Sequence, residues 1–545
     1  MKMIYSLLLF TLFFSCNKDV DNTELIVENY SINESNSKSL KGCDLNPVIK
    51  IDFSTKIDAQ SAQDIPKVYG GNGLIDIDIS LENDDSTIVI KPINNLNYLT
   101  YHLLYIDTFL KAQNGNYLNS KFKSNFTTKL DSTDKYSQIS DDELLELIQR
   151  QTFKYFWDFS HPDSGLARER NTSGDIVTSG GSGFGIMSII VGVDRGFISR
   201  EEGLNRLLKI TDFLKNKADR FHGAFSHWLN GSTGKVVPFS TKDDGGDIVE
   251  TSYLLAGLLS ARQYFDGSSD NEVNLRNMIN NIWNSVEWNW YTKNDEKVLY
   301  WHWSPDYEWA MNHQLKGWNE ALITYILAAS SPDYAIDKDV YDQGWASNGS
   351  IKNGNTFYGY TLPLGSDYGG PLFFEQYTFL GIDPHELSDN YADYWTQVVN
   401  HSLINYEYCK ANPKNYYGYS DICWGLTASD SNDGYSAHSP TNDLGVITPT
   451  AALSSMAFSP EESMAALRFF YYTLGDKLFK EYGFIDAFNL NELWFANSFL
   501  AIDQGPIIVM IENYRSGLIW NLLMNDPDVK AGMQKLEFHS GKYGF

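Results

Sequence analysis

The hydrophobic period of the sequence changes between residues 122 and 156, which read FKSNFTTKLDSTDKYSQISDDELLELIQRQTFKYF. In Phe122–Phe126 the two apolar side chains stand at an even spacing, which predicts a short strand with one buried face. From Asp141 onward an acidic first turn leads into an apolar stripe that includes Leu144 and Leu145, which predicts a helix. The chain therefore passes from a β-domain to an α-helical domain within this stretch.

Upstream of this change, short alternating segments are separated by turn residues. Roughly six or seven strands in about 85 residues are typical of a β-sandwich, which we assign to residues 44–131. The order IDFSTKID, STIVIKPINNLNYLTYHLLYID and FTTKLD resembles bacterial Ig-like domains. No catalytic groups cluster here, so we expect a spacer or a binding module. The clearest predicted strands are Val48–Phe53, Ile75–Ile79, Thr87–Ile90 and Phe122–Phe126.

Downstream, helical periodicity continues to the end of the chain. About a dozen helices with loops rich in Gly, Asp and Trp predict one large all-α domain over residues 138–545. Paired as inner and outer rings, these helices would form an (α/α)6 toroid, whose loops surround one central cleft. The predicted helices lie near 183–194, 200–217, 247–264, 271–288, 318–330, 370–380, 388–406, 445–456, 460–474, 491–500 and 506–523.

The first residues indicate an export signal. Residues 1–15 carry Lys2 and then an apolar run of about 11 residues, too short to span a bilayer but sufficient for a signal peptide. Ser15-Cys16 resembles a lipoprotein processing site, so we expect a lipid on Cys16 and a protein anchored at the outer membrane or on the periplasmic face. The alternative is an ordinary secretory signal cut nearby. The polar, Ser/Asn-rich residues 16–43 are expected to be a tether.

Composition restricts the possible partners. With 42 basic and 69 acidic residues the net charge is −27, which excludes a nucleic-acid footprint. The aromatic share of 14% supplies faces on which sugars can stack. Four cysteines in this length are no disulfide framework; a Cys409–Cys423 pair is the one alternative to free thiols. Zinc motifs are absent from the sequence, so we expect no metal and no cofactor.

One acidic stretch, STKDDGGDIVETSYLL at residues 240–255, is the most informative for function. Asp247 and Glu250 are three residues apart at a helix start and share one face, with Asp243 on the loop before them. One interpretation is N-capping by a solvated acidic turn. The other is a polar ligand site, because closely spaced carboxylates repel one another. A helix N-terminus stabilises the carboxylate anion, so these residues suit hydroxyl binding better than proton donation.

A second candidate cluster combines aromatic side chains with an acid. Trp303 and Trp309 precede Trp318, and Glu320 follows at the predicted start of the next helix. Desolvation by an indole would raise the pKa of Glu320 and suit it for general acid catalysis, whereas the helix dipole would lower this pKa. The sequence does not decide between these two effects, and an exposed first-turn Glu320 is the third interpretation. Tyr368 lies in a further polar and aromatic loop.

The third candidate stretch is AIDQGPIIVMIENYRSGLIW at residues 501–520. Pro506 suits the first turn of a helix, which would leave Asp503 on the preceding loop, facing the cleft. Glu512 and Arg515 are three residues apart, so an ion pair between them is the alternative to a role for Arg515 in binding substrate.

Taken in order, several motifs from Leu144 to Phe538 resemble the bacterial glycoamylase-like domain, and specifically glycoside hydrolase family 144, the β-1,2-glucanases. The resemblance implies an (α/α)6 fold, no metal, a proton donor at Glu320 and a base at Asp503. It also implies that Asp243, Asp247 and Glu250 are acidic site residues. The motifs are Trp157-Asp158, SGLA at 164–167, TSGGSGFG at 178–185, Asp243-x3-Asp247-x2-Glu250-Thr, GWNE at 317–320, and QGP at 504–506 with ENYR at 512–515.

The resulting hypothesis is an inverting β-1,2-glucan hydrolase, endo-acting or sophorose-releasing. Glu320 would protonate the leaving oxygen and Asp503 would activate water on the opposite face of the sugar. Two alternatives stay open: a glucoamylase-like hydrolase of another linkage, and a non-catalytic surface glycan-binding lipoprotein. A glucan partner, a lipid anchor and a monomer are expected. The expected substrate-binding residues are Asp243, Asp247, Glu250, Trp303, Trp309, Trp318, Tyr368 and Arg515.

Overall fold

The chain divides into two compact units, Met1–Asp131 and Ser132–Phe545. The computed structural model describes residues 23–71 and 73–545, so the predicted signal peptide over 1–15 and the predicted lipidation site Cys16 lie outside the described residues. Within the described ranges, no helix combines the length and the apolar composition needed to cross a bilayer.

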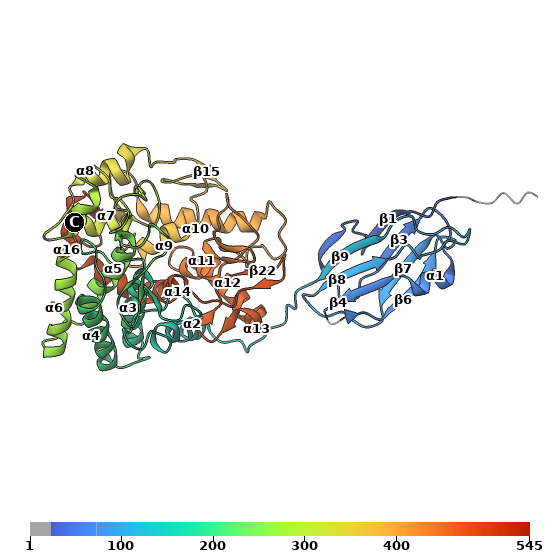
Figure 1. Cartoon of the computed structure of the whole chain (residues 1–545), viewed down its shortest axis with the longest axis horizontal. Helices are drawn as coiled ribbons and strands as arrows, with labels where there is room; N and C mark the ends of the chain where they lie inside the picture. Colours follow the sequence, from blue (N-terminus) through green and yellow to red (C-terminus); the bar gives the residue numbers. More distant parts are fainter. Residues whose placement is uncertain (1–22, 72) are drawn as a thin grey trace, which may run out of the picture. The chain divides into compact units, whose positions relative to one another are not determined.

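The N-terminal unit is a sandwich of two β-sheets (Figure 1). One sheet has the strand order β1-β3-β7-β6 and the other the order β2-β9-β8-β4-β5, with β2 and β9 parallel. One short helix, α1 (Ala59–Asp64), begins after the N-cap Asp58. The strands are β1 (Val27–Ile32), β2 (Ser39–Cys43), β3 (Ile49–Phe53), β4 (Lys67–Gly70), β5 (Gly73–Leu74), β6 (Ile77–Glu82), β7 (Thr87–Pro92), β8 (Tyr101–Ile106) and β9 (Phe122–Thr128).

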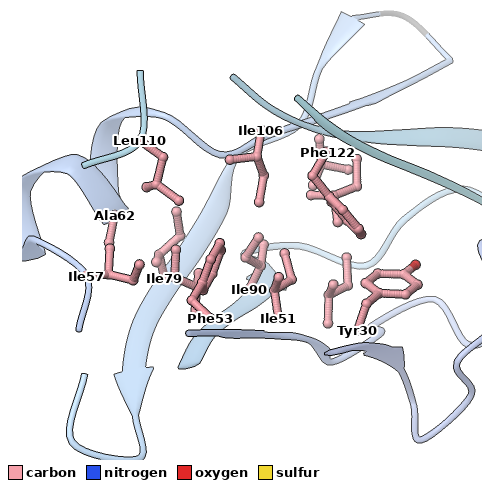
Figure 2. Close-up of a cluster of buried hydrophobic side chains, with 14 of the residues drawn as sticks. Tyr30, Ile51, Phe53, Ile57, Ala62, Ile79, Ile90, Ile106, Leu110 and Phe122 are labelled. Atoms are coloured by element: carbon pink, nitrogen blue, oxygen red, sulfur yellow. The ribbon is translucent and has the colours of Figure 1, made fainter. Parts of the chain in front are cut away.

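Alternation along the strands builds the core between the two sheets. In β3, Ile49, Ile51 and Phe53 are buried while the residues between them are not. Figure 2 shows Ile51 and Phe53 within a cluster that also contains Ile106 of β8 and Phe122 of β9. This unit therefore has a hydrophobic core of its own, as an independently folding domain requires.

The predicted tether over residues 16–43 is wrong for residues 27–43, which form β1 and β2. Tyr30 and Ile32 are buried in the core, and β1 pairs with β3 over Ile32↔Ile49. The stretch is polar overall because the side chains between these anchors face solvent. Its few buried residues were too sparse to predict a strand from the sequence.

The C-terminal unit is mainly helical (Figure 1). Its first helix, α2, begins with a capping box in which Ser140 and Glu143 exchange hydrogen bonds, as the acidic first turn suggested. The helices are α2 (Asp141–Trp157), α3 (Ser179–Asp194), α4 (Arg200–Asn216), α5 (Ile248–Tyr264), α6 (Asp270–Asn284), α7 (Leu322–Ser330), α8 (Lys338–Val340), α9 (Phe373–Phe379), α10 (Tyr394–Ala411), α11 (Pro449–Ser454), α12 (Pro460–Arg468), α13 (Gly475–Leu478), α14 (Ala501–Ser516), α15 (Leu518–Met524) and α16 (Pro527–Lys535).

Two kinds of helix differ in how they are buried. In α3, α5 and α14 nearly every residue is buried, including polar ones, so these helices lie inside the unit. In α4 and α6 the buried residues follow one face and the remaining positions are mostly polar, which is typical of helices that cover a core. The acidic stretch at 240–255 belongs to the interior helix α5.

Short elements fill the loops between the helices. They differ from the prediction at 491–500, where a helix was expected and the structure has β23 (Trp494–Phe495) paired with β22 (Phe488–Asn489). Cys43, Cys409 and Cys423 are all buried free thiols. Further short elements are β10 (Ile176–Thr178), β11 (Trp228–Asn230), β12 (Val236–Val237), β13 (Gly246–Asp247), β14 (His302–Trp303), β15 (Thr356–Phe357), β16 (Tyr360–Thr361), β17 (Leu387–Ser388), β18 (Ala428–Ser431), β19 (Gly434–Ala437), β20 (Phe479–Lys480), β21 (Gly483–Phe484), β24 (His539–Ser540), η1 (Trp288–Thr292), η2 (Tyr341–Trp345), η3 (Ser347–Gly349) and η4 (Phe469–Thr473).

Candidate active site

A cavity of about 390 Å³ lies in the helical unit and collects residues from distant parts of the sequence. Three carboxyl groups line it, those of Glu169, Glu250 and Glu320. Most of its remaining wall is aromatic or aliphatic, as expected of a site that binds the apolar faces of a polar ligand. The other lining residues are Arg170, Thr178, His227, Trp228, Phe239, Val249, Tyr253, Trp301, Phe373, Tyr377, Ala428, Tyr435, Ala437, Leu500 and Ile502.

Asp247 is the N-cap of α5, and it is also part of the site. Its Oδ1 accepts hydrogen bonds from the backbone N–H groups of Val249 and Glu250, both at 2.9 Å. Its Oδ2 accepts one from the indole N–H of Trp301 at 3.0 Å. One carboxylate oxygen thus caps the helix while the other faces side chains of the site. The predicted N-cap is confirmed, but the predicted solvated turn is wrong, because Asp247 and Glu250 are buried.

Two histidines neutralise the acidic stretch. The Nδ1 atom of His227 lies 3.3 Å from Oδ2 of Asp247, and the Nε2 atom of His302 lies 3.2 Å from Oδ2 of Asp243. Burial would favour the neutral imidazoles, but the nearby carboxylates prevail and raise the pKa of each histidine to about 9. Burial also opposes ionisation of Asp247, yet hydrogen bonds from both histidines lower its pKa. The two histidines thus favour the ionised form of Asp247 despite its burial.

Neither histidine was predicted as a site residue. His302 stands in the aromatic cluster, and pairing of β13 with β14 sets it directly opposite Asp247. His227 lies just before β11, and no sequence motif includes both His227 and Asp247. A search of the sequence for histidines that could balance four neighbouring carboxylates would have suggested both residues, but could not have ranked them.

Glu250 is held by the first turn of the neighbouring helix α3. Its Oε2 accepts hydrogen bonds from the backbone N–H of Gly180 at 2.8 Å and from the hydroxyl of Thr178 at 3.3 Å. A Cβ on Gly180 would lie 2.4 Å from this oxygen, so the contact requires glycine. Burial raises the pKa of Glu250, and the charge of Asp247 adds to the effect while His227 opposes it.

Glu320 lies in the turn two residues before α7, with its main chain held by two neighbouring helices. Its carbonyl accepts hydrogen bonds from the hydroxyl of Tyr253 at 3.2 Å and that of Thr378 at 3.0 Å. Burial, assisted by the charges of Glu250 and Asp247, raises the pKa of Glu320 to about 7. The predicted increase of this pKa by desolvation is confirmed, and Glu320 is suited to donate a proton near neutrality.

Asp503 lies in the first turn of α14, not on the loop that was predicted. The helix starts at Ala501, so Pro506 is its sixth residue; only one hydrogen bond near the helix start is lost. Asp503 is 2% exposed and lies outside the lining of the cavity, whereas Ile502 is part of it. Burial, and then the charge of Asp486, raise the pKa of Asp503 well above its ordinary value.

A chain of polar contacts connects this buried pair of acids with the cavity wall. The backbone N–H of Asp430 donates to Oδ2 of Asp486 at 2.7 Å, and the Arg170 guanidinium contacts the Asp430 carboxylate at 3.1 Å. Arg170 also pairs with its neighbour Glu169 at 3.0 Å. Burial raises the pKa of Glu169 despite this partner. Glu169 and Arg170 were not predicted as site residues, since no spacing along the chain distinguishes them.

Of the predicted substrate-binding residues, Glu250 lines the cavity, Asp243 and Asp247 are not part of its lining, and Arg515 and Trp318 lie away from it. Arg515 lies near the opposite end of α14 and forms ion pairs with Asp142 at 2.8 Å and Glu146 at 2.9 Å, both on α2. Trp318 is buried in the core against Trp345. The ion pairs hold Arg515 to α2, and packing removes Trp318 from contact with a ligand. Glu512, the predicted partner of Arg515, pairs with Arg195 instead.

The remaining predicted aromatic platforms lie outside the cavity wall. Trp303 packs edge-on against the ring of His222, and Trp309 packs against Tyr300. Tyr368 contacts Phe357 in a separate loop. A role for Trp303, Trp309 or Tyr368 at more distant sugar positions stays a prediction. Trp301, between the acids of α5 and the cavity, is the tryptophan of this cluster that lines the wall.

Comparison with known families supports both units of the chain. A family model described as "Putative glucoamylase" matches residues 312–527, and one described as "Bacterial Ig-like domain" matches residues 21–128. The second match includes β1 and β2, in agreement with the correction to the predicted tether.

Individual relatives match about three quarters of this chain. A curated protein of Parabacteroides distasonis, named exo β-1,2-glucooligosaccharide sophorohydrolase (non-reducing end), is 49% identical over 422 residues; the alignment covers 73% of this chain and 58% of the relative. A solved structure from Bacteroides uniformis, described as a putative glucoamylase, is 58% identical, with 75% of this chain and 100% of that chain covered and a TM-score of 0.74.

A second solved structure adds a bound sugar. It is described as an endo-β-1,2-glucanase from Chitinophaga pinensis in complex with sophorotriose and glucose. The two chains are 54% identical, with 74% of this chain and 100% of that chain covered and a TM-score of 0.73. Identity above one half over the whole length of both solved chains confirms the resemblance seen in the motifs. The chain belongs to the glycoamylase-like family and carries a bacterial Ig-like domain at its N-terminal side.

Proposed function

We propose that this chain is a glycoside hydrolase that cleaves β-1,2-glucan, either within the chain or by releasing sophorose. The observation that carries the proposal is Glu320, a carboxyl with a pKa of about 7 in a cavity with aromatic walls, facing the acids of α5. The names of the relatives from Chitinophaga pinensis and Parabacteroides distasonis support the linkage. Because the chain spans 58% of the curated relative, the activity of that whole protein is a proposal here.

Glu320 is the proposed general acid. In its protonated form it would donate its proton to the glycosidic oxygen as the bond to the anomeric carbon breaks, either directly or through a sugar hydroxyl. The hydrogen bonds from Tyr253 and Thr378 to its main-chain carbonyl would fix the backbone from which the side chain projects. Asp243, Asp247 and Glu250 would bind glucose hydroxyls, and Trp301 would stack on a ring.

The proposed base takes a proton from the attacking water. Asp503 is the candidate from family resemblance, but its buried carboxyl has to be ionised before it can act. Glu169 is the candidate that the geometry adds, because it lines the cavity beside Arg170. In an inverting enzyme the acid and the base are about 6.5–9.5 Å apart, which leaves room for the water. We propose inversion.

We also infer that the helices of this unit form an (α/α)6 toroid. The support is the division between interior helices such as α3, α5 and α14, which are buried on all sides, and the amphipathic helices α4 and α6. Concentric rings produce this division, because an inner helix has neighbours on every side.

Product analysis tests the reaction. Purified protein is incubated with linear and cyclic β-1,2-glucan and with α-1,4-, β-1,3- and β-1,4-glucans, and products are separated by chromatography. Sophorose as the sole early product from linear glucan indicates exo action, whereas opening of the cyclic glucan requires endo action. Turnover of another linkage alone, or binding without turnover from pH 5 to 8, contradicts the proposal. Proton NMR of the first product assigns its anomeric configuration and so tests inversion.

The role of Glu320 is tested by Glu320→Gln, which keeps the shape and removes the proton. We expect kcat to fall by at least about 100-fold, the contribution typical of a general acid. The matched control is Glu308→Gln, an exposed acid in the same loop. Near-normal turnover by the Glu320 variant would contradict the assignment.

The base is tested by comparing Glu169→Gln with Asp503→Asn. We expect the variant that lacks the base to lose about 100-fold or more in kcat while it retains substrate binding. A loss of kcat in Asp503→Asn alone favours Asp503, the candidate from family resemblance, as the base. A loss of kcat in Glu169→Gln alone favours Glu169, the candidate that lines the cavity. Unchanged turnover in both variants would exclude both residues.

The proposed location is the cell envelope, with a monomer anchored by a lipid on Cys16 at the outer membrane or on the periplasmic face. The support is the apolar run before Ser15-Cys16 in the sequence. Labelling of cells with a radioactive fatty acid tests this, with Cys16→Ser as the control that should remain unlabelled. Light scattering of the purified protein tests the monomer.

A further inference from the structure

Two aromatic side chains on the wall of the cavity are largely exposed. Tyr435 is 54% exposed and Phe239 is 50% exposed, and both residues line the cavity. The other aromatic residues of the wall are buried or half-buried. A single exposed ring on a protein surface is ordinary, but two such rings on the wall of one cavity leave apolar surface where a ligand can cover it.

The ring of Phe239 is packed on one side. It stacks on the imidazole of His227 with a centroid distance of 4.2 Å and an angle of 20° between the ring planes, and it meets Trp228 edge-on at 4.8 Å. The backbone N–H of Phe239 donates to the carbonyl of Asp243 at 2.9 Å, which fixes the backbone that carries the ring. Because one face of the ring is covered by His227, its exposed surface lies on the face turned away from that histidine.

Tyr435 belongs to the hairpin of β18 and β19. It is paired with Asp430, and Ala437 is paired with Ala428, so these four side chains lie on one face of the hairpin. Ala428, Tyr435 and Ala437 line the cavity. This face of the hairpin is therefore part of the cavity wall, and Tyr435 is the aromatic residue on it.

Side-chain contacts fasten the hairpin to the rest of the helical unit. The Asp430 carboxylate accepts a hydrogen bond from the hydroxyl of Ser498 at 2.5 Å and contacts the Arg170 guanidinium at 3.1 Å. The hydroxyl of Thr448 donates to that of Ser429 at 2.7 Å. Because the hairpin is held in place before a ligand arrives, little conformational entropy is lost when the ring on it binds that ligand.

The two rings reach the cavity from separate elements. Phe239 follows β12 and stacks on His227, beside the acids of α5. Tyr435 stands opposite Asp430, which binds Arg170 of the cavity wall. A glucan bound in this cavity, which also contains the proposed general acid, can therefore contact apolar surface on two different elements.

We propose that Phe239 and Tyr435 are aromatic platforms on which glucose units of the bound glucan stack, and that these contacts determine the affinity for the substrate. The proposal rests on the proposed function, since it takes β-1,2-glucan as the ligand. The C–H groups of a glucose ring form an apolar face that an aromatic ring can cover. Such a contact is the same before and during bond cleavage, so it strengthens binding without accelerating the chemical step. Neither ring was among the platforms predicted from the sequence.

The platforms are tested by the KM and kcat for β-1,2-gluco-oligosaccharides. Tyr435→Ala and Phe239→Leu are each expected to raise KM at least about fivefold, with kcat within about threefold of the wild type. Leucine keeps an apolar contact with His227 but removes the flat face. The double variant is expected to multiply the two effects on KM, because the rings belong to separate elements. Unchanged KM in both single variants, or a loss of kcat alone, overturns the proposal.

Two further variants separate stacking from other causes. Tyr435→Phe keeps the ring and removes the hydroxyl, so KM is expected to stay within about twofold of the wild type. Tyr514→Ala is the matched control, because it removes a tyrosine that is 45% exposed near the end of α14 and outside the cavity wall. Melting curves show that each variant is folded. A rise in KM for Tyr435→Phe as large as for Tyr435→Ala, or an equal rise in the control, contradicts stacking.

Binding without turnover separates this proposal from the proposed function. A β-1,2-gluco-oligosaccharide is titrated into Glu320→Gln by calorimetry, and the addition of Tyr435→Ala or Phe239→Leu is expected to weaken its affinity at least about fivefold. Failure of the wild-type chain to hydrolyse any glucan contradicts the proposed function, and the titration still decides whether the rings bind sugar. Normal hydrolysis of β-1,2-glucan with unchanged affinity in both variants contradicts the platforms alone.

Discussion

At the scale of single residues, the surroundings of Glu320 decide its chemistry. An exposed glutamate ionises near 4.5 and cannot donate a proton at neutral pH, whereas burial beside Glu250 and Asp247 raises the pKa of Glu320 to about 7. The sequence suggested that an indole and the helix dipole would compete at this position. In the structure Glu320 lies two residues before α7, and burial is the largest influence on its carboxyl, whose pKa is raised.

The pH profile of turnover follows from this pKa. If Glu320 acts as the proton donor, only its protonated form is active, so kcat/KM is expected to fall about tenfold for each pH unit well above 7. Initial rates on β-1,2-gluco-oligosaccharides from pH 5 to 9 measure this basic limb. A value of kcat/KM that does not fall between pH 7 and 9 would indicate a different proton donor.

The same pKa predicts a change in stability. The carboxyl of Glu320 ionises near 4.5 in the unfolded chain and near 7 in the folded chain, so the folded state binds the proton more tightly. Its contribution to stability is complete below 4.5 and is lost as the pH rises through 7. The free energy of unfolding of Glu320→Gln minus that of the wild type is therefore expected to be roughly 2 kcal/mol higher at pH 9 than at pH 5.

Urea unfolding of the helical unit at the two pH values measures this difference. Glu308→Gln, whose side chain is exposed, is the control and should show no such gain. An equal effect of pH on both variants would mean that the Glu320 carboxyl is not destabilised when it ionises in the folded protein.

At the scale of elements, two glycines set the distance between α3 and α5. A Cβ on Gly257 would lie 2.3 Å from the carbonyl oxygen of Gly183, and a Cβ on Gly183 would lie 2.1 Å from that of Tyr253. Both neighbours are backbone atoms, which cannot rotate away as a side chain would. This close packing allows Glu250 on α5 to reach the N-terminus of α3, where Gly180 and Thr178 bind it.

Gly257→Ala is expected to separate α3 from α5 and to lower both stability and activity. Overpacking of this kind costs about 1–3 kcal/mol, and movement of Glu250 would reduce kcat as well. Urea unfolding and initial rates measure the two effects. Asn274→Ala, at an exposed position of α6, is the control. A fully stable and active Gly257→Ala would show that the helices can adjust without disturbing the site.

At the scale of the whole molecule, the two units have separate cores. The sandwich buries its own cluster, which includes Phe53 and Ile90, and the cavity is lined only by residues of the helical unit (Figure 2). Each unit thus has what independent folding requires. Every described residue that lines the cavity comes from the helical unit.

Removal of the first unit is expected to leave catalysis intact. A fragment of residues 132–545 should retain the kcat and KM of the full chain for short, soluble β-1,2-gluco-oligosaccharides, and calorimetry of the full chain should resolve two unfolding transitions. Loss of turnover in a fragment that melts like the helical unit would mean that the Ig-like domain supports the active site.

The parts of this protein that the sequence by itself determined are those with a local physical basis. The change from period 2 to period 3.6 after Ser140, the acidic first turn of α2, and the cap at Asp247 all arise from contacts between residues a few positions apart. These local signals, with the order of the motifs, were enough to predict the two domains and to select Glu250 and Glu320.

Only the tertiary structure decided what depends on contacts between distant segments. The sandwich recruits Tyr30 and Ile32 from a stretch that looks like a tether; Arg515 is drawn away from the site by α2; and His227 joins Asp247 without any motif. The surroundings of Glu320 and Asp503 also differ in a way that only the fold determines. Glu320 lines the cavity, whereas Asp503 is enclosed beside another acid, Asp486. Desolvation and charge pairing act through space, so the fold, and not spacing along the chain, determines which carboxyl holds a proton.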